Sequence, residues 1–241
     1  MSITVCTVSG KGGTGKSTVS SGIAIAAAKE GQKVLLIDLD AGLGCLDIIF
    51  GVEESVVFRL DDALEDGDIT KALYTAKNYE NIFIVPAPDK AERIDFKRLN
   101  ALVGSIKNDY DLIILDFPAG ADFGAYSSFA DARFLIVTGA DDVSVKAAAA
   151  ISRGLSSFAK ARLVINRFDK DMMTAGYYRN IDAVIDTAGT QLLGIVPADG
   201  ELLLLNRNHK IKQKGRAFKA FDRIYKRISG EEVPLPKLKK I

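Results

Sequence analysis

Near the start of the chain stands the stretch Gly10-Lys11-Gly12-Gly13-Thr14-Gly15-Lys16-Ser17. It fits the pattern Gly-x-x-x-x-Gly-Lys-Ser, which is typical of loops that wrap around the phosphates of a nucleotide. The apolar run at residues 3–8 predicts a strand before it, and residues 17–29 predict a helix after it. A glycine-rich turn without a ligand is the alternative, and the strand–loop–helix context argues against it. We therefore expect a phosphate-binding loop at the amino end of a helix.

The residue types in this loop each suit phosphate chemistry. Glycines allow backbone N–H groups to converge on phosphate oxygens, and the helix N-terminus adds partial positive charge. Lys16 is placed to reach the β- and γ-phosphates, and the Ser17 hydroxyl is placed to bind Mg²⁺. The loop thus predicts ATP or ADP together with Mg²⁺ as cofactors.

Apolar runs and helical patterns alternate along the rest of the chain. The runs are continuously apolar, as in strands that are covered on both faces. The alternation predicts an α/β fold. We expect a single doubly wound domain, residues 1–230, with a mainly parallel sheet of about seven to eight strands, helices on both faces, and a short basic tail at residues 231–241. The further predicted strands are 33–38, 82–86, 112–116, 134–138, 162–166 and 192–196, and the further predicted helices are 95–107, 143–159, 178–188 and 215–228.

The composition narrows the class of protein. Hydrophobic residues make up 48% of the chain, enough for a sizeable core. The two cysteines, Cys6 and Cys45, have no paired spacing, which excludes a disulfide framework and gives no zinc signature. No signal-peptide layout and no apolar run of about 20 residues is present, so we expect a cytoplasmic protein.

Charge is distributed unevenly along the chain. Residues 207–241 hold twelve Lys or Arg against three acidic residues, a net charge of +9, whereas the whole chain carries only +1. Such asymmetry suggests an anionic partner surface, although a solvated helix face would give the same pattern.

Three acidic residues stand at predicted strand ends. Asp38 ends the strand 33–38, Asp40 follows two residues later, and Asp116 ends the strand 112–116. Ligands bind at the carboxyl ends of strands in open α/β sheets, and an acid there can hold a Mg²⁺-bound water. The alternative is that these are helix caps or turn residues, which is common for Asp.

The motifs together resemble the MinD/ParA family of deviant Walker A ATPases over about residues 2–235. The run Lys11–Thr18 looks like the deviant Walker A loop, in which the early signature lysine, here Lys11, reaches the nucleotide of a partner subunit. Residues 38–47 read D-L-D-A-G-L-G-C-L-D and resemble switch I of the MinD branch, whereas the plasmid-partition branch has Pro-Gln-Gly after the second Asp. Residues 116–120 read D-F-P-A-G and resemble switch II.

The resemblance implies a role for each of these positions. Lys11, Lys16 and Asp40 would be catalytic, with Asp40 orienting the attacking water. Asp38 would support the metal shell, and the Gly120 N–H would contact the γ-phosphate. The implied nucleotide-binding residues of the loop are Gly10, Lys11, Gly12, Gly13, Thr14, Gly15, Lys16, Ser17 and Thr18, and the implied metal residues are Ser17, Asp38, Asp40 and Asp116.

Residues near the last two predicted strands suggest recognition of adenine. Asn166, followed by Arg167, ends one strand, and an amide can both donate to and accept from an adenine edge. The last strand leads into Pro197 and Asp199, which resemble the family's G-x-x-P-x-D loop beside the base. Taken singly, each could equally be a capping Asn or a turn Pro.

Two segments depart from the MinD pattern. Residues 139–147 lack the usual Asn-Pro-Glu start, so Asp141 would replace the Glu that reaches a partner's ribose, and Ala147 stands near an expected Asp. The family ends in an amphipathic membrane-binding helix. In this chain the corresponding segment consists of two prolines and a few residues after them, which is too short for a stable interfacial helix.

The resemblance implies an ATP-dependent switch for spatial positioning in a bacterial cell, such as septum-site placement. ATP would drive formation of a sandwich homodimer, and an activating or effector protein would stimulate slow hydrolysis. An anionic membrane surface at the inner face of the cell membrane is a candidate partner of the basic C-terminal region. The alternatives are a DNA-partitioning or flagellar-placement ATPase, with nonspecific DNA as partner, and a nucleotide-gated scaffold with negligible hydrolysis.

Overall fold

The chain is built around one eight-stranded sheet, as a computed structural model shows for residues 2–90, 94–207 and 213–236. The strand order is β3-β4-β2-β5-β1-β6-β7-β8, and every neighbouring pair is parallel except β3 with β4. The strands are β1 (Ile3–Ser9), β2 (Val34–Asp38), β3 (Tyr74–Thr75), β4 (Ile82–Val85), β5 (Leu112–Ala119), β6 (Arg133–Thr138), β7 (Lys160–Phe168) and β8 (Leu192–Pro197).

Nine α-helices are present among the described residues. They are α1 (Lys16–Lys29), α2 (Leu46–Phe50), α3 (Leu60–Asp66), α4 (Phe96–Ile106), α5 (Phe123–Ser127), α6 (Asp142–Leu155), α7 (Lys170–Thr174), α8 (Ile181–Ala188) and α9 (Arg216–Ser229). Short 3-10 helices cover Glu53–Ser55, Ile69–Ala72, Lys107–Asp109 and Gly200–Arg207. Within this part of the chain, no helix combines the length and apolar character that a bilayer crossing requires.

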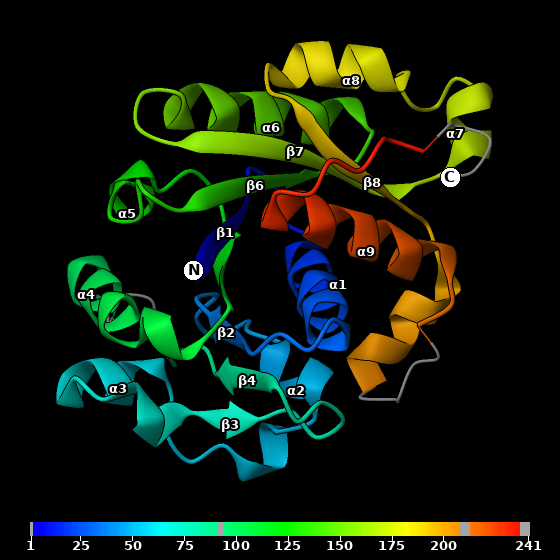
Figure 1. The fold of residues 1–241 in the computed structure, drawn as a ribbon. Coiled ribbons are helices and arrows are strands. Elements are labelled where there is room, and N and C mark those ends of the chain that lie inside the picture. The colour runs from blue at the N-terminus through cyan, green and yellow to red at the C-terminus, as the bar shows by residue number, and fades with distance from the viewer. Residues whose placement is uncertain (1, 91–93, 208–212, 237–241) are drawn as a thin grey trace.

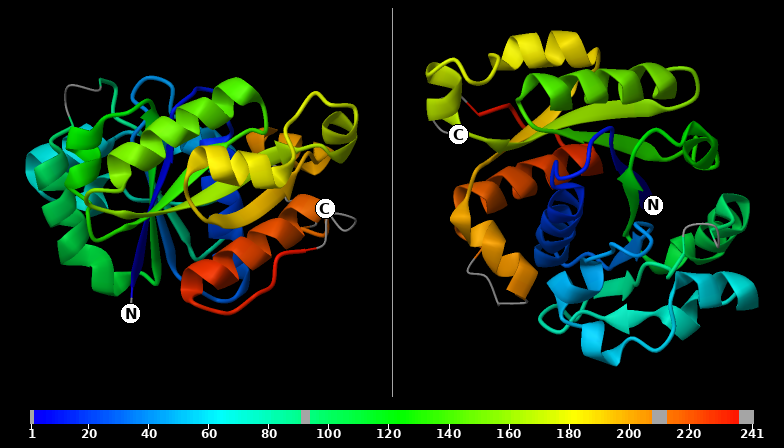
Figure 2. Two further views of the ribbon diagram at one scale, coloured as in Figure 1. Left: turned by 90° about the horizontal axis from the view of Figure 1, so that it is seen from above. Right: turned by 180° about the vertical axis from the view of Figure 1, so that it is seen from behind.

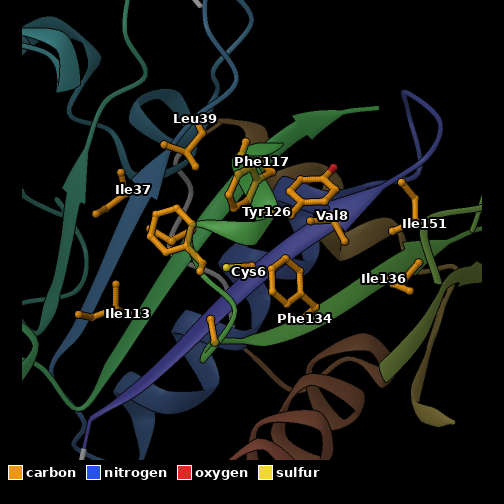
Figure 3. Close-up of a cluster of buried hydrophobic side chains, with 14 of the residues drawn as sticks. Cys6, Val8, Ile37, Leu39, Ile113, Phe117, Tyr126, Phe134, Ile136 and Ile151 are labelled. Carbon is orange, nitrogen blue, oxygen red and sulfur yellow. The ribbon is translucent and has the colours of Figure 1, made fainter. Parts of the chain in front are cut away.

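The helices cover both faces of the sheet, as predicted. Helices α1, α2 and α9 pack on one face, and α3, α4, α5, α6 and α8 pack on the other (Figures 1 and 2). Side chains of β1 alternate between the two cores, with Val5 toward α1 and Cys6 and Val8 toward the opposite face. That opposite core includes the aromatic rings of Phe117, Tyr126 and Phe134 (Figure 3). Because both faces are covered, the strands can be continuously apolar.

Helices α1 and α9 are in close contact at Gly22, where the absence of a side chain leaves room for Phe221. A Cβ at Gly22 would lie 2.3 Å from the ring of Phe221, which is fully buried. The apolar stripe predicted for the last helix is therefore its contact with α1 and the sheet. This packing fixes the helix whose amino end bears the phosphate-loop motif.

The long elements agree with the sequence prediction, and the differences concern boundaries and short elements. Helix α6 ends at Leu155, whereas the apolar pattern predicted 159. The segment predicted as one helix over 178–188 begins only at Ile181, where the Asn180 side chain caps it by accepting from Ala183 N. The short elements α2, α3, α5, α7 and β3 were not predicted.

The sheet reverses direction of winding at β1, since its neighbours β5 and β6 lead to opposite edges. Such a switch point is where open α/β sheets bind ligands, at the carboxyl ends of the strands. The loop Gly10–Ser17 leaves β1 at this point, so the fold places the motif where ligand binding is expected.

Candidate functional site

The loop after β1 turns back onto the amino end of α1 through two left-handed glycines. Gly13 has φ +77° and Gly15 has φ +86°, conformations that residues with a Cβ rarely adopt. Gly15 precedes the helix, and no side chain caps the first turn of α1. The free N–H groups of that turn are therefore available to an anion. Lys16 is 93% buried in this turn, while Ser17 and Thr18 are half-buried beside it.

The loop is wedged between α6 and the end of β7. A Cβ at Gly10 would lie 2.6 Å from the carbonyl oxygen of Ala147, and one at Gly15 would lie 2.2 Å from the Asn166 side chain. Ala147, noted above as a departure from the family pattern, is thus the residue of α6 against which the loop packs. Neither position has room for a Cβ, so glycine is required by the neighbouring residues and not by the shape of the turn alone.

Asn166 and Arg167 hold the loop from the end of β7. The Asn166 amide donates to Thr14 O at 2.8 Å, and an Arg167 guanidinium N–H donates to Gly13 O at 3.1 Å. The sequence predicted only base recognition here and missed this support, because nothing in a strand-end Asn shows which loop it will face. The Asn166 Oδ1 is buried without a hydrogen-bond partner among the described residues. The contact of this side chain with adenine stays a prediction.

Pro197 and Asp199 lie at the end of β8, beside the end of β7. Pro197 is in register with Phe168, and the Asp199 carboxylate accepts from Glu201 N at 3.0 Å and from Ala217 N at 3.1 Å. Asp199 therefore joins β8 to the start of α9. Its predicted place beside a nucleotide base remains a prediction.

Asp38 and Asp116 are register partners on the neighbouring strands β2 and β5, and both are buried. Asp38 Oδ1 accepts from Asp40 N at 3.0 Å, and Oδ2 accepts from Cys45 N at 3.0 Å and Leu46 N at 3.1 Å. Asp38 thereby fixes the segment predicted to be switch I. Burial and the negative charge of Asp116 raise the pKa of Asp38 to about 7, against the effect of the three N–H donors.

Asp116 has one oxygen that is held and one that is not. The Ser20 hydroxyl donates to Oδ1 at 3.0 Å, whereas the buried Oδ2 has no hydrogen-bond partner among the described residues. Burial raises the pKa of Asp116, while the Ser17 hydroxyl, Lys16 and Ser20 oppose that rise.

The donor set around Asp116 fits Mg²⁺. A buried, unpartnered carboxylate oxygen near the Ser17 hydroxyl offers the hard oxygen ligands that this ion prefers. No group of three or more Cys, His, Asp or Glu side chains able to hold an ion is found in the described chain. Mg²⁺ is usually bound through one or two carboxylates, waters and nucleotide phosphates, and its site here stays a prediction. Asp40 lies half-buried just beyond β2.

The segment predicted to be switch II is paired with β1 in this structure. Strand β5 runs on to Ala119, beyond the predicted end at Asp116, and Gly120 N donates to Ser9 O at 2.9 Å. The Tyr126 hydroxyl, which the sequence did not single out, donates to Gly120 O at 2.7 Å. The N–H predicted to meet a γ-phosphate is therefore engaged with the chain's own backbone here.

Lys11 lies on the rim of the loop, unlike Lys16. Its ammonium group is 3.6 Å from Asp141 Oδ1, and both side chains are more than 40% exposed. Asp141 also caps α6 by accepting from Ser144 N at 3.0 Å. The pair borders a cavity of about 190 Å³ that Arg167 and Tyr178 also line. The two lysines of one loop thus face different surroundings, one buried and one solvent-exposed.

Comparison with known proteins agrees with this geometry. Residues 5–211 match the CobQ/CobB/MinD/ParA nucleotide binding domain. The septum site-determining protein MinD of Synechocystis sp. is 30% identical over 95% of this chain and 90% of its own.

Solved structures of MinD proteins share the fold. MinD in the MinC:MinD complex of Aquifex aeolicus superposes with a TM-score of 0.88 at 31% identity, over 98% of this chain and 99% of its own. MinD of Pyrococcus horikoshii complexed with Mg-ADP has a TM-score of 0.82 at 24% identity, over 95% and 97%. With the phosphate loop and this similarity over nearly the whole chain in place, the chain belongs to the MinD/ParA family of nucleotide-binding ATPases, on its MinD-like, septum-site-determining side.

Proposed function

We propose that this protein is an ATP-dependent molecular switch in which Mg-ATP closes two copies into a sandwich dimer and slow hydrolysis reopens it. The loop N–H groups, the amino end of α1 and the buried Lys16 would hold the phosphates. Asp40 would orient the attacking water. Ser17, with Asp116 and Asp38 behind it, would hold Mg²⁺, which would supply positive charge to balance that of the phosphates. Positioning and charge neutralisation of this kind suffice for slow phosphoryl transfer.

The observation that carries the proposal is the difference in exposure between the two loop lysines. Lys16 is buried at the start of α1, whereas the side chain of Lys11 is on the surface with an exposed carboxylate beside it. Exposed ion pairs are worth about 1 kcal/mol or less, so Lys11 can leave Asp141 at little cost. A lysine placed on the rim and free to reach outward supports a role toward a second copy of the chain.

Light scattering in the presence of nucleotide tests the switch. The parent protein should be monomeric with ADP and dimeric with ATP and Mg²⁺, because only ATP offers the γ-phosphate that the dimer contacts. Lys16→Ala should not bind nucleotide, and Lys11→Ala should bind it without dimerising. Asp40→Ala should remain an ATP-locked dimer. If Asp40→Ala hydrolyses ATP at the parent rate, the assignment of the water-positioning residue is wrong.

Partners would determine where the switch acts. We propose that the protein is cytoplasmic and that an activating or effector protein binds it. We also propose that its basic C-terminal region contacts an anionic membrane surface. Residues 237–241, which include the last three lysines, lie outside the described residues, as do Lys210 and Lys212. Exposed Lys214 and Lys219 would contribute attraction to anionic lipid.

The same positive charge leaves nonspecific DNA as a second candidate. Two basic groups of α9 and one of α1 are engaged within the molecule, which makes them poorer phosphate ligands. Arg227 donates to Val233 O, Lys226 lies 4.0 Å from Glu30, and Lys29 pairs with Asp222 on α9.

Phosphate release measured alone, with anionic vesicles and with DNA distinguishes these partners. Stimulation by vesicles supports positioning at a membrane, whereas stimulation by DNA that falls steeply with salt supports partitioning. ATP-dependent dimers without measurable release under any of the three conditions would indicate a nucleotide-gated scaffold.

A further inference from the structure

We infer that Ser20 and Thr7 are positioning residues that hold one oxygen of Asp116 and leave its other oxygen free for the coordination sphere of the metal ion. The inference rests on the proposed function, because it assigns these two hydroxyls a task at the proposed Mg²⁺ site. Neither residue belongs to the motifs from which the site was predicted.

The three side chains form one buried hydrogen-bonded chain across three elements. Thr7 on β1 is the register partner of Asp116 on β5, and Ser20 lies one turn into α1. Ser20 Oγ is 2.7 Å from Thr7 Oγ1 and 3.0 Å from Asp116 Oδ1, and all three residues are fully buried. Because these groups are shielded from water, each of their hydrogen bonds must be made within the protein or to a bound ligand.

The direction of the hydrogen bonds follows from which of the three side chains has a proton to donate. An ionised carboxylate, the form that a cation requires, can only accept. Ser20 has a single hydroxyl proton, so it donates that proton to Asp116 and accepts from Thr7. The Thr7 hydroxyl therefore donates its proton to Ser20. Its other possible acceptor, Leu115 O at the longer distance of 3.2 Å, does not receive that proton in this arrangement. The chain runs from Thr7 through Ser20 to Asp116.

This order fixes the orientation of the carboxylate. Rotation about the terminal torsion of an Asp is soft, so an unrestrained carboxylate samples a broad range of angles. With Oδ1 held by Ser20, Oδ2 remains buried and unpartnered near Ser17, where the metal-bound water is expected. Partners that orient the residues of a metal site typically affect metal affinity by about 10- to 100-fold.

The experiment measures how much Mg²⁺ strengthens ADP binding in the full-length protein. ADP affinity is determined by calorimetry with saturating Mg²⁺ and again with EDTA, and the ratio of the two values is compared among variants. We expect Ser20→Ala to reduce this ratio by roughly tenfold while leaving the affinity in EDTA unchanged. Thr7→Val, which keeps the shape of the side chain, should reduce it less, because one bond of the chain then remains.

Ser21→Ala supplies the matched control. Ser21 is the next residue of α1, is equally buried, and its hydroxyl has no hydrogen-bond partner among the described residues. Removal of that hydroxyl should leave the Mg²⁺ effect at the parent value. In the Ser20→Ala background, Thr7→Val should add no further loss, since its bond to Ser20 is already gone.

The outcomes separate this inference from the proposed function. If the parent protein gains no ADP affinity from Mg²⁺, the metal assignment fails and the positioning role fails with it. If the parent gains affinity and Ser20→Ala matches the parent or Ser21→Ala, only the positioning role is overturned. Equal losses in the presence of Mg²⁺ and of EDTA would show a structural effect and would overturn it as well.

Discussion

The buried acids Asp38 and Asp116 show how a single pair of residues connects stability with function. Two carboxylates side by side at the ends of neighbouring strands disfavour double ionisation, since each raises the cost of charging the other. Three backbone N–H groups offset part of this cost at Asp38, and the Ser17 hydroxyl, Lys16 and Ser20 do so at Asp116. The two carboxylates therefore keep negative charge that these groups do not fully balance, and a bound cation would balance it.

Stability of the metal-free protein should fall as the pH rises. The pKa of Asp38 is about 7 in the folded chain and near 3.8 when unfolded, so between these values the folded state holds a proton that the unfolded state has lost. That contribution is fully present below pH 4 and is lost as the pH rises through 7. In EDTA, we expect the free energy of unfolding from urea titrations to decrease by about 2–3 kcal/mol between pH 5 and pH 8.

Asp116→Asn serves as the control for this slope. It removes the negative neighbour but not the burial of Asp38, so the decrease should become smaller without disappearing. Constant or rising stability of the parent from pH 5 to pH 8 would contradict the coupling.

At the level of elements, the sequence predicted what local pattern determines and missed what distant contacts determine. The seven mutually parallel strands were predictable because burial on both faces makes them continuously apolar, whereas the two-residue antiparallel strand β3 was not. Helix α2 was not, because it begins where the Asp38 carboxylate accepts the N–H groups of Cys45 and Leu46, and five residues carry little pattern of their own. The same limit applies to the site. Motifs marked Lys16, Asp38 and Asp116, but a buried hydroxyl such as that of Ser20 has no distinguishing sequence pattern.

The contact between α1 and α9 should dominate the contribution of α9 to stability. Phe221 is fully buried against Gly22, and replacing a buried Phe by Ala typically costs about 3–5 kcal/mol through lost burial and the resulting cavity. Urea unfolding should therefore show Phe221→Ala destabilised by this amount with an unchanged m-value. Lys219→Ala, at an exposed position of the same helix, should remain within about 0.5 kcal/mol of the parent. A cost below about 1 kcal/mol for Phe221→Ala would show that the two helices repack readily.

For the whole molecule, the site joins elements from both halves of the chain. The loop after β1 is held by α6 and by the end of β7, and Asp116 on β5 is held by α1. A ligand at this junction therefore stabilises the entire domain rather than one segment, because it binds only when all these elements are in place.

Thermal unfolding should register that stabilisation. Mg-ADP at 100 times its Kd should add about 2.7 kcal/mol to the free energy of unfolding and raise Tm by roughly 5–10 °C. Scanning calorimetry of Lys16→Ala under the same conditions should show no shift, while its Tm without nucleotide stays near that of the parent. A shift in Lys16→Ala equal to that of the parent would place the nucleotide elsewhere on the protein.

The hydrogen bond from Asn166 to Thr14 spans 152 residues of sequence, which has a consequence during synthesis. The phosphate loop leaves the ribosome early, but its supporting side chains follow only after a delay of roughly 8 to 30 seconds at a synthesis rate of about 5–20 residues per second. A nascent chain that ends before β7 should therefore lack a competent nucleotide site, however complete its loop motif. Nucleotide cannot then template the first half of the domain, and binding becomes a late sign that the chain has finished folding.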